Sequence, residues 1–144
     1  MCMCMCIHIC ICMGASASRN ESKSKSDSDS TNISLNSELN DVCHRHSLMQ
    51  AQYNRMTHDR YDHSPMDKAI NEHGLKWTQY GENVARGQQS EEIVMNVWMH
   101  SPPHRRNILN PTFTHMGAAL AQPGNYWTQG FATLPGKWNA PMCP

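Results

Sequence analysis

Among the metal-ligating and acid–base side chains in the central part of this 144-residue chain, three stand out: His63, Glu82 and His104. Each stands among residues typical of turns, where functional side chains concentrate. Two imidazoles and one carboxylate are a sufficient ligand set for a zinc ion with one coordination position left open. The same three groups could instead exchange protons as general acid and base. On composition alone, scattered polar residues of this kind are more typical of surface or capping groups, and their spacing does not show that they meet.

The setting of His104 is the most specific of the three. Pro102 and Pro103 precede it, and they are expected to end the helix that arrives from Trp98. His104 is therefore predicted to lie just past a helix end, on stiff backbone suited to presenting a side chain. The same break means that His100 and His104, although four residues apart, are not a helical metal-binding pair.

The other candidate residues have simpler interpretations. His46 lies on an apolar helix face and is predicted to be a hydrogen-bonded core histidine. Arg105 and Arg106 are interpreted as the solvated flank of the preceding histidine loop. Cys43 has no fixed base nearby in the sequence and is interpreted as a core or disulfide residue. A disulfide with Cys143 is one prediction if the chain is secreted, and two unrelated thiols are the equal alternative.

The composition excludes several classes of partner. Twelve basic and twelve acidic residues balance, and no basic stripe is interleaved with aromatic residues, which argues against nucleic acid. No apolar run reaches the length of a transmembrane segment. Five of the seven cysteines lie in the opening MCMCMCIHICIC, so the folded part is not a disulfide-dense scaffold.

The N-terminal part has three interpretations. Residues 1–13 alternate among four residue types and residues 14–34 are rich in serine, which together favour an artefactual or disordered leader followed by a linker. The leader could instead be a signal peptide cleaved after Ala17, which implies secretion. If translation starts at Met13, MGASAS fits a myristoylation signal, and the protein would be cytoplasmic and anchored to a membrane through Gly14.

Helical patterns come first in the remaining chain. Apolar residues between Leu39 and Met56 recur at spacings of three and four, which predicts a long helix capped by Ser37. A short helix is expected at 66–76, and a second long helix is expected after Ser90. The apolar stripe predicted for this last helix consists of Ile93, Val94, Val97 and Trp98.

Strand-like patterns come last. The segment GENVARGQQS, residues 81–90, is predicted to be a turn-rich crossing. Strands are expected at 115–121 and 125–133, joined across Pro123–Gly124. Helices followed by strands predict an α+β layered domain over residues 35–134, between a leader at 1–34 and a C-terminal tail at 135–144.

Four motifs in a fixed order carry a family resemblance: DHSP, YGENVARG, WMHSPPHRRNILNPTFTHMGAAL and YWTQGFA. From about Leu39 to Phe131 the chain resembles CAP-superfamily domains, the group of cysteine-rich secretory proteins, antigen 5 and pathogenesis-related 1. It is most similar to the small SCP-like branch of bacteria and fungi. The resemblance implies a three-layer α-β-α sandwich with a shallow cleft. Because the chain enters this pattern at ISLNSEL, the family's first helix is expected to be missing.

The resemblance also implies roles for the candidate residues. It places His63 and His104 in the cleft as ligands of a divalent metal, with zinc the best match, and Glu82 beside them as a polar cleft residue. Ser101 stands where animal and plant members carry a second glutamate, so the four-residue constellation of the family is incomplete here.

Three functions follow from the resemblance. The first is an extracellular, non-enzymatic binding domain, with a metal in the cleft and a lipid or sterol in its grooves. The second is a metal-assisted hydrolase that uses the same three residues. The third is a protein-interaction scaffold without a cleft ligand. The incomplete constellation and the lack of an evident nucleophile favour the first.

Overall fold

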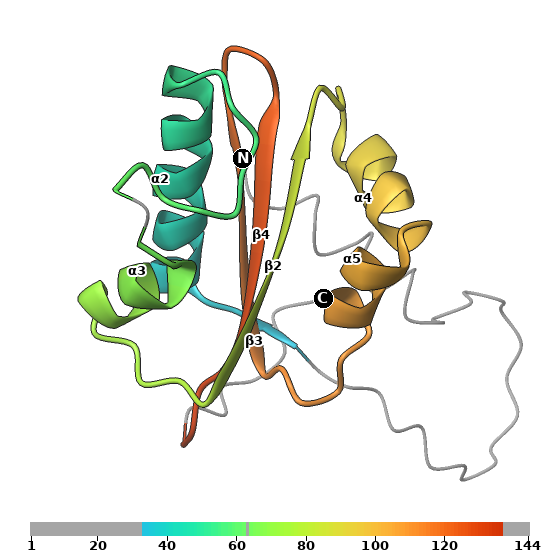
Figure 1. The fold of residues 1–144 in the computed structure, drawn as a ribbon. Coiled ribbons are helices and arrows are strands. Elements are labelled where there is room, and N and C mark those ends of the chain that lie inside the picture. The colour runs from blue at the N-terminus through green and yellow to red at the C-terminus, as the bar shows by residue number, and fades with distance from the viewer. Residues whose placement is uncertain (1–32, 63, 137–144) are drawn as a thin grey trace, which may run out of the picture.

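The computed structural model describes residues 33–62 and 64–136. Helices and strands alternate more than the sequence patterns predict (Figure 1). In chain order the elements are β1 (Ser34–Leu35), α2 (Ser37–Gln52), α3 (Met66–Glu72), β2 (Gln79–Arg86), α4 (Glu91–Met99), α5 (Pro102–Ile108), β3 (His115–Ala121) and β4 (Tyr126–Thr133).

The four strands form one sheet in the order β1-β3-β4-β2. The short β1 runs parallel to β3, whereas β3–β4 and β4–β2 are antiparallel pairs. Helices α2 and α3 lie against one face of the sheet, and α4 and α5 lie against the other (Figure 1). The predicted three-layer α-β-α sandwich is therefore confirmed. The expected absence of the family's first helix concerns residues before Ile33, which lie outside the described residues, so it stays a prediction.

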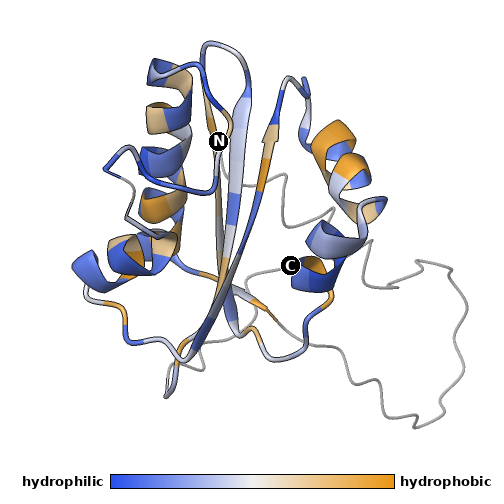
Figure 2. Cartoon of the chain, viewed as in Figure 1, coloured by the Kyte–Doolittle hydropathy of each residue, from blue (hydrophilic) through white to orange (hydrophobic). Residues whose placement is uncertain are grey.

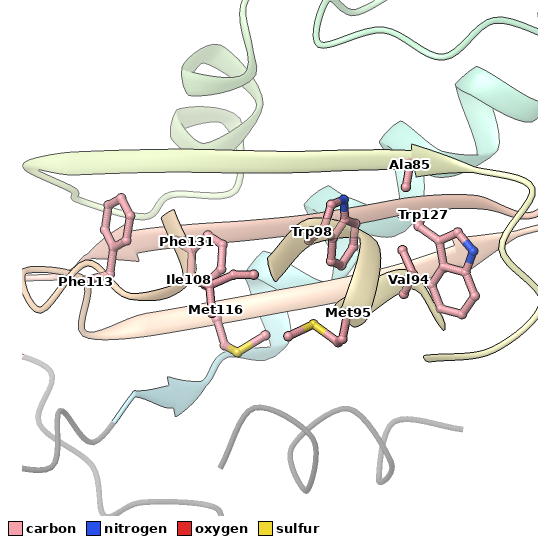
Figure 3. Close-up of a cluster of buried hydrophobic side chains, with 9 residues drawn as sticks. All are labelled: Ala85, Val94, Met95, Trp98, Ile108, Phe113, Met116, Trp127 and Phe131. Atoms are coloured by element: carbon pink, nitrogen blue, oxygen red, sulfur yellow. The ribbon is translucent and has the colours of Figure 1, made fainter. Parts of the chain in front are cut away.

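Each face of the sheet has its own apolar core. The core beneath α4 and α5 centres on Trp98, which is fully buried and donates its indole N–H to the Val84 carbonyl at 3.1 Å (Figure 3). Its other members are Ala85, Val94, Met95, Ile108, Phe113, Met116, Trp127 and Phe131. The core beneath α2 and α3 contains Leu39, Val42, Met66, Ala69, Ile70, Leu75, Ala132 and Leu134. The predicted burial of Trp98 is thus confirmed.

Helix α2 begins and ends slightly differently from the sequence prediction. Its N-cap is Asn36, whose side-chain oxygen accepts the Leu39 N–H at 2.8 Å, rather than Ser37. The helix ends at Gln52, so Tyr53 and Met56 are exposed instead of continuing the buried stripe. The left-handed backbone of Asn54, with φ of 50°, turns the chain away just beyond this end.

Helices α4 and α5 correct two expectations. Ser90 caps α4 as predicted, but Ile93 and Val97 face solvent, because the arc that meets the sheet is formed by Val94, Met95 and Trp98. The Pro102–Pro103 pair does not leave an irregular loop: Pro102 starts α5. Proline is tolerated there because the first N–H groups of a helix need no intrahelical partner.

Strand β2 corrects a third expectation. The segment predicted as turn-rich is extended from Gln79 to Arg86 and pairs along its length with β4. Gly81 is needed there for close packing, since a Cβ at this position would lie 2.9 Å from the Phe113 ring. The two C-terminal strands lie where the sequence predicts them, joined by a turn at residues 122–125.

Cys43 lies in the interior of the sandwich. Its side chain is fully buried, and this burial raises the pKa of its thiol. Cys143 lies outside the described residues, so their pairing stays a prediction. No helix among the described residues is both long and apolar enough to cross a bilayer.

Candidate functional site

Glu82 is the centre of a buried polar group on the edge strand β2. Only 4% of its side chain is exposed. Its Oε1 atom lies 2.7 Å from Nδ1 of His58. Its Oε2 atom lies 3.8 Å from Nε2 of His46 and has no hydrogen-bond partner among the described residues. The Glu82 carboxylate therefore lies between a buried and an exposed imidazole and hydrogen-bonds the exposed one.

His58 is held on the loop that follows α2. The imidazole N–H of His46 donates to the Thr57 carbonyl at 2.8 Å, and the Thr57 N–H donates to the Gln50 side chain at 3.1 Å. These bonds fix the backbone next to His58, whose side chain remains 60% exposed. The hydrogen bond to Glu82 raises the pKa of His58 above its usual value, against the opposing effect of partial burial.

His104 approaches the same edge from α5. Its Nδ1 atom is buried and has no hydrogen-bond partner in the described part of the chain. Burial lowers the pKa of His104, and the charge of His58 lowers it further. Both effects favour the uncharged form of the His104 imidazole.

A buried amide network connects the two sides of this site. Asn107 donates to the Glu82 carbonyl at 3.1 Å and to the Asn83 side chain at 2.9 Å. Asn83 in turn donates to the His104 carbonyl at 3.2 Å and to the Gln129 side chain at 3.0 Å. The backbones that carry Glu82 and His104 are thus tied to each other through side-chain amides of β2, β4 and α5.

The structure describes two of the three residues predicted from the sequence. Glu82 and His104 lie in a strand and a helix rather than in turns. His63 lies outside the described residues, so its role stays a prediction. His58 was missed, because the sequence motif drew attention to the histidine five positions later. One feature of the sequence could have indicated it: His58 follows closely after the helix that carries His46 on its buried face, so the two histidines could be expected near each other. The prediction that His46 is a hydrogen-bonded core residue is confirmed.

A divalent metal can be tested against these residues. Among residues 33–62 and 64–136, no three His, Cys, Asp or Glu side chains gather closely enough to form a metal site. Two observations nevertheless suit a two-imidazole site. Glu82 bonds one ring nitrogen of His58, as carboxylates do behind metal-ligating histidines, which leaves Nε2 for a ligand. The lowered pKa of His104 favours its uncharged form, and its buried Nδ1 has no hydrogen-bond partner among the described residues. Among the described residues, His58 and His104 are thus the two candidate metal ligands.

The chain is similar to known proteins of one family. The profile of the cysteine-rich secretory protein (CAP) family matches residues 23–133. Over 68 residues, 47% of the chain, it is 46% identical to YkwD, an uncharacterized protein of Bacillus subtilis. It is 26% identical over 63% of its length to YlbC, an uncharacterized membrane protein of the same species. The matches cover 26% of each of these longer proteins.

Solved structures agree with the sequence relatives. An extracellular SCP-domain protein of Bacillus anthracis superposes with a TM-score of 0.64 and 26% identity, over 69% of this chain and 33% of that one. An outer surface protein of Borrelia burgdorferi gives a TM-score of 0.67 at 16% identity, over 72% and 78% of the two chains. The second likeness shows the fold alone. With the family profile covering most of the chain and the sandwich matching SCP-domain structures, the protein belongs to the cysteine-rich secretory protein (CAP) family.

Proposed function

We propose that this CAP domain is a non-enzymatic binding domain that holds a divalent cation, most readily zinc, through His58 and His104. The observation that carries the proposal is the 2.7 Å hydrogen bond between Glu82 and His58, on the strand whose Asn83 side chain also bonds the backbone of His104. Glu82 orients His58 and makes its free ring nitrogen a better electron donor. When bound, the cation supplies a positive charge that attracts an anionic or carbonyl group of a ligand.

The proposed ligand is a lipid with a single acyl chain. A cavity of about 320 Å³ lies between α2 and α3, with apolar lining from Val42, Met49, Met66 and Ala69. Its rim carries the ion pair of Arg60 and Glu72, 3.0 Å apart. This volume is at the lower end of the range of ligand pockets, about 300–1,000 Å³. It therefore favours one acyl chain over a bulkier sterol.

The proposed place of action is outside the cell. The Bacillus anthracis relative described above, at 26% identity, is named as an extracellular protein. Sequencing the N-terminus of the natural protein tests this proposal. A start soon after Ala17 supports secretion, whereas a blocked Gly14 supports the cytoplasmic, lipid-anchored alternative.

Zinc titration by calorimetry tests the metal site. We expect His58→Ala or His104→Ala to weaken zinc binding by at least about tenfold, and Glu82→Gln to weaken it roughly 10- to 100-fold through loss of orientation. His100→Ala, on the exposed end of α4, is the matched control and should bind like the wild type.

Two results would change the assignment. Unchanged zinc binding by a His58→Ala/His104→Ala double variant removes the site altogether. Loss of binding in His63→Ala, with normal binding in His58→Ala, restores the ligand predicted from the sequence and overturns the role of His58. Ester hydrolysis that copurifies with the wild type and disappears in His58→Ala would instead support the hydrolase.

A further inference from the structure

The outer face of α4 carries apolar side chains that the described residues leave uncovered. Ile93 is 50% exposed and Val97 is 43% exposed. Spacings of four and three place Ile93, Val97 and His100 on one side of the helix. Figure 2 shows much of α4 in the colour of hydrophobic residues. This row of side chains leads along α4 toward its junction with α5.

A broad hollow of about 960 Å³ continues the row across this junction. Besides His100, its lining includes Arg105 and Arg106, which project from α5. The apolar part of the lining comes from Met99, Pro102, Leu109 and Pro111. No carboxylate of the described residues lines this hollow, so apolar surface and positive charge occur together.

The two arginines have no acidic partner in the described part of the chain. Both are exposed, and neither takes part in an ion pair within residues 33–62 or 64–136. The nearest acidic residues along the chain, Glu91 and Glu92, lie in the first turn of α4. The length of α4 places these two glutamates about 13 Å from His100 at the other end of the helix. This distance exceeds the Debye length of about 8 Å at physiological salt, so their charge is largely screened there. The arginine end of the surface is therefore positive.

We propose that the α4–α5 surface, made of Ile93, Val97, Arg105, Arg106 and Leu109, docks on a membrane that contains anionic lipids. Interfacial binding needs aliphatic side chains that enter the headgroup region and cationic side chains that meet lipid phosphates. Leu109, 39% exposed, supplies the first kind of group at the end of α5, beside the two arginines. An acidic peptide fits less well, because this surface is helical and offers no strand edge for an extended partner.

Vesicle cosedimentation of the full chain tests the proposal. At low salt, we expect the wild type to bind phosphatidylcholine vesicles that contain phosphatidylglycerol and to leave pure phosphatidylcholine vesicles free. Arg105→Gln/Arg106→Gln should lower the partition coefficient by roughly fivefold for each arginine and about 25-fold for both. Val97→Ser should also weaken binding, because it removes an inserting side chain.

The matched control is Arg55→Gln/Lys76→Gln. It removes the same charge from exposed positions that follow α2 and α3, outside the α4–α5 surface, and should bind like the wild type. Absence of wild-type binding to the anionic vesicles would overturn the proposal. So would equal losses in the two double variants, because attraction would then depend on net charge alone. Wild-type binding to an acidic, apolar peptide but not to vesicles would assign the surface to a protein partner instead.

Discussion

Glu82 is both a site residue and a buried part of the fold. The sequence places it among residues typical of turns, but its carboxylate is almost fully enclosed and lies near two histidines. The hydrogen bond to this carboxylate raises the pKa of His58. Substitution of Glu82 should therefore alter the stability of the protein even when no metal is bound.

The pH dependence of this effect has a definite sign. A histidine whose folded pKa is raised contributes stability that is fully present below its unfolded pKa, about 6.5, and is lost as pH rises through the folded value. In chelator-treated protein, we expect the stability advantage of the wild type over Glu82→Gln to be larger near pH 5.5 than near pH 8.5. Urea denaturation at the two pH values measures this difference in the free energy of unfolding.

A variant at His58 provides the control for this prediction. In a His58→Gln background, the stability change caused by Glu82→Gln should lose most of its pH dependence, because the titrating partner is gone. His104 acts in the opposite direction, because its lowered pKa makes the protein less stable as pH falls. The wild type, the two single variants and the double variant all contain His104, so its contribution cancels to first order. A stability change that is the same at both pH values in the wild-type background would contradict the prediction.

Helix α2 packs directly against β3 at Gly117. A Cβ at this position would lie 2.3 Å from the Leu39 carbonyl carbon and 2.4 Å from the Asn40 nitrogen. These are backbone atoms of a helix, so they cannot move aside as a side chain can. We expect Gly117→Ala to lower the free energy of unfolding by about 3 kcal/mol or more, measured by chemical denaturation.

Gly130 provides a matched comparison for this helix contact. It pairs with Gly117 across the sheet, and an added Cβ would meet only the Cys43 sulfur, at 3.0 Å. Gly130→Ala should therefore cost clearly less than Gly117→Ala. Equal losses would show that α2 can shift away from the sheet, and that the close backbone contact is not what limits Gly117.

The end of α4 depends on Trp98. The indole fills the core between α4 and β2 and bonds the Val84 carbonyl (Figure 3). Trp98→Ala should lower the free energy of unfolding by about 3–5 kcal/mol, the range for a core aromatic residue, in a thermal or urea melt. Trp77→Ala is the control at a half-buried tryptophan and should cost less. Comparable losses at the two positions would contradict the central role of Trp98.

At the scale of the whole molecule, the site forms where the layers of the sandwich meet. The loop carrying His58 follows α2 on one face of the sheet, whereas α5 carries His104 on the other face. Glu82 lies between them on the edge strand β2. The site is therefore assembled only when both helical layers are docked on the sheet.

This assembly explains what the sequence could predict. Helix α2, the cap of α4 and the last two strands follow local periodicity and capping, which a short window contains. The fold class followed from a resemblance carried by four motifs. The pairing of His58 with Glu82 spans 24 positions in the chain and depends on tertiary structure. Strand β2 was missed because its glycine and asparagine, typical of turns, serve close packing and the amide network instead.

The brevity of β1 has a consequence for self-association. β1 pairs only with His115 and Met116, so the rest of β3 has no strand partner on that side within the described residues. An open strand edge can template pairing with another molecule. Here the Asn40 side chain of α2 accepts the Ala118 N–H at 2.9 Å, occupying a backbone donor that an incoming strand would need. Protection against intermolecular β-sheet growth is thus supplied by a helix, and partial detachment of α2 would expose an aggregation-prone edge before the sheet itself unfolds.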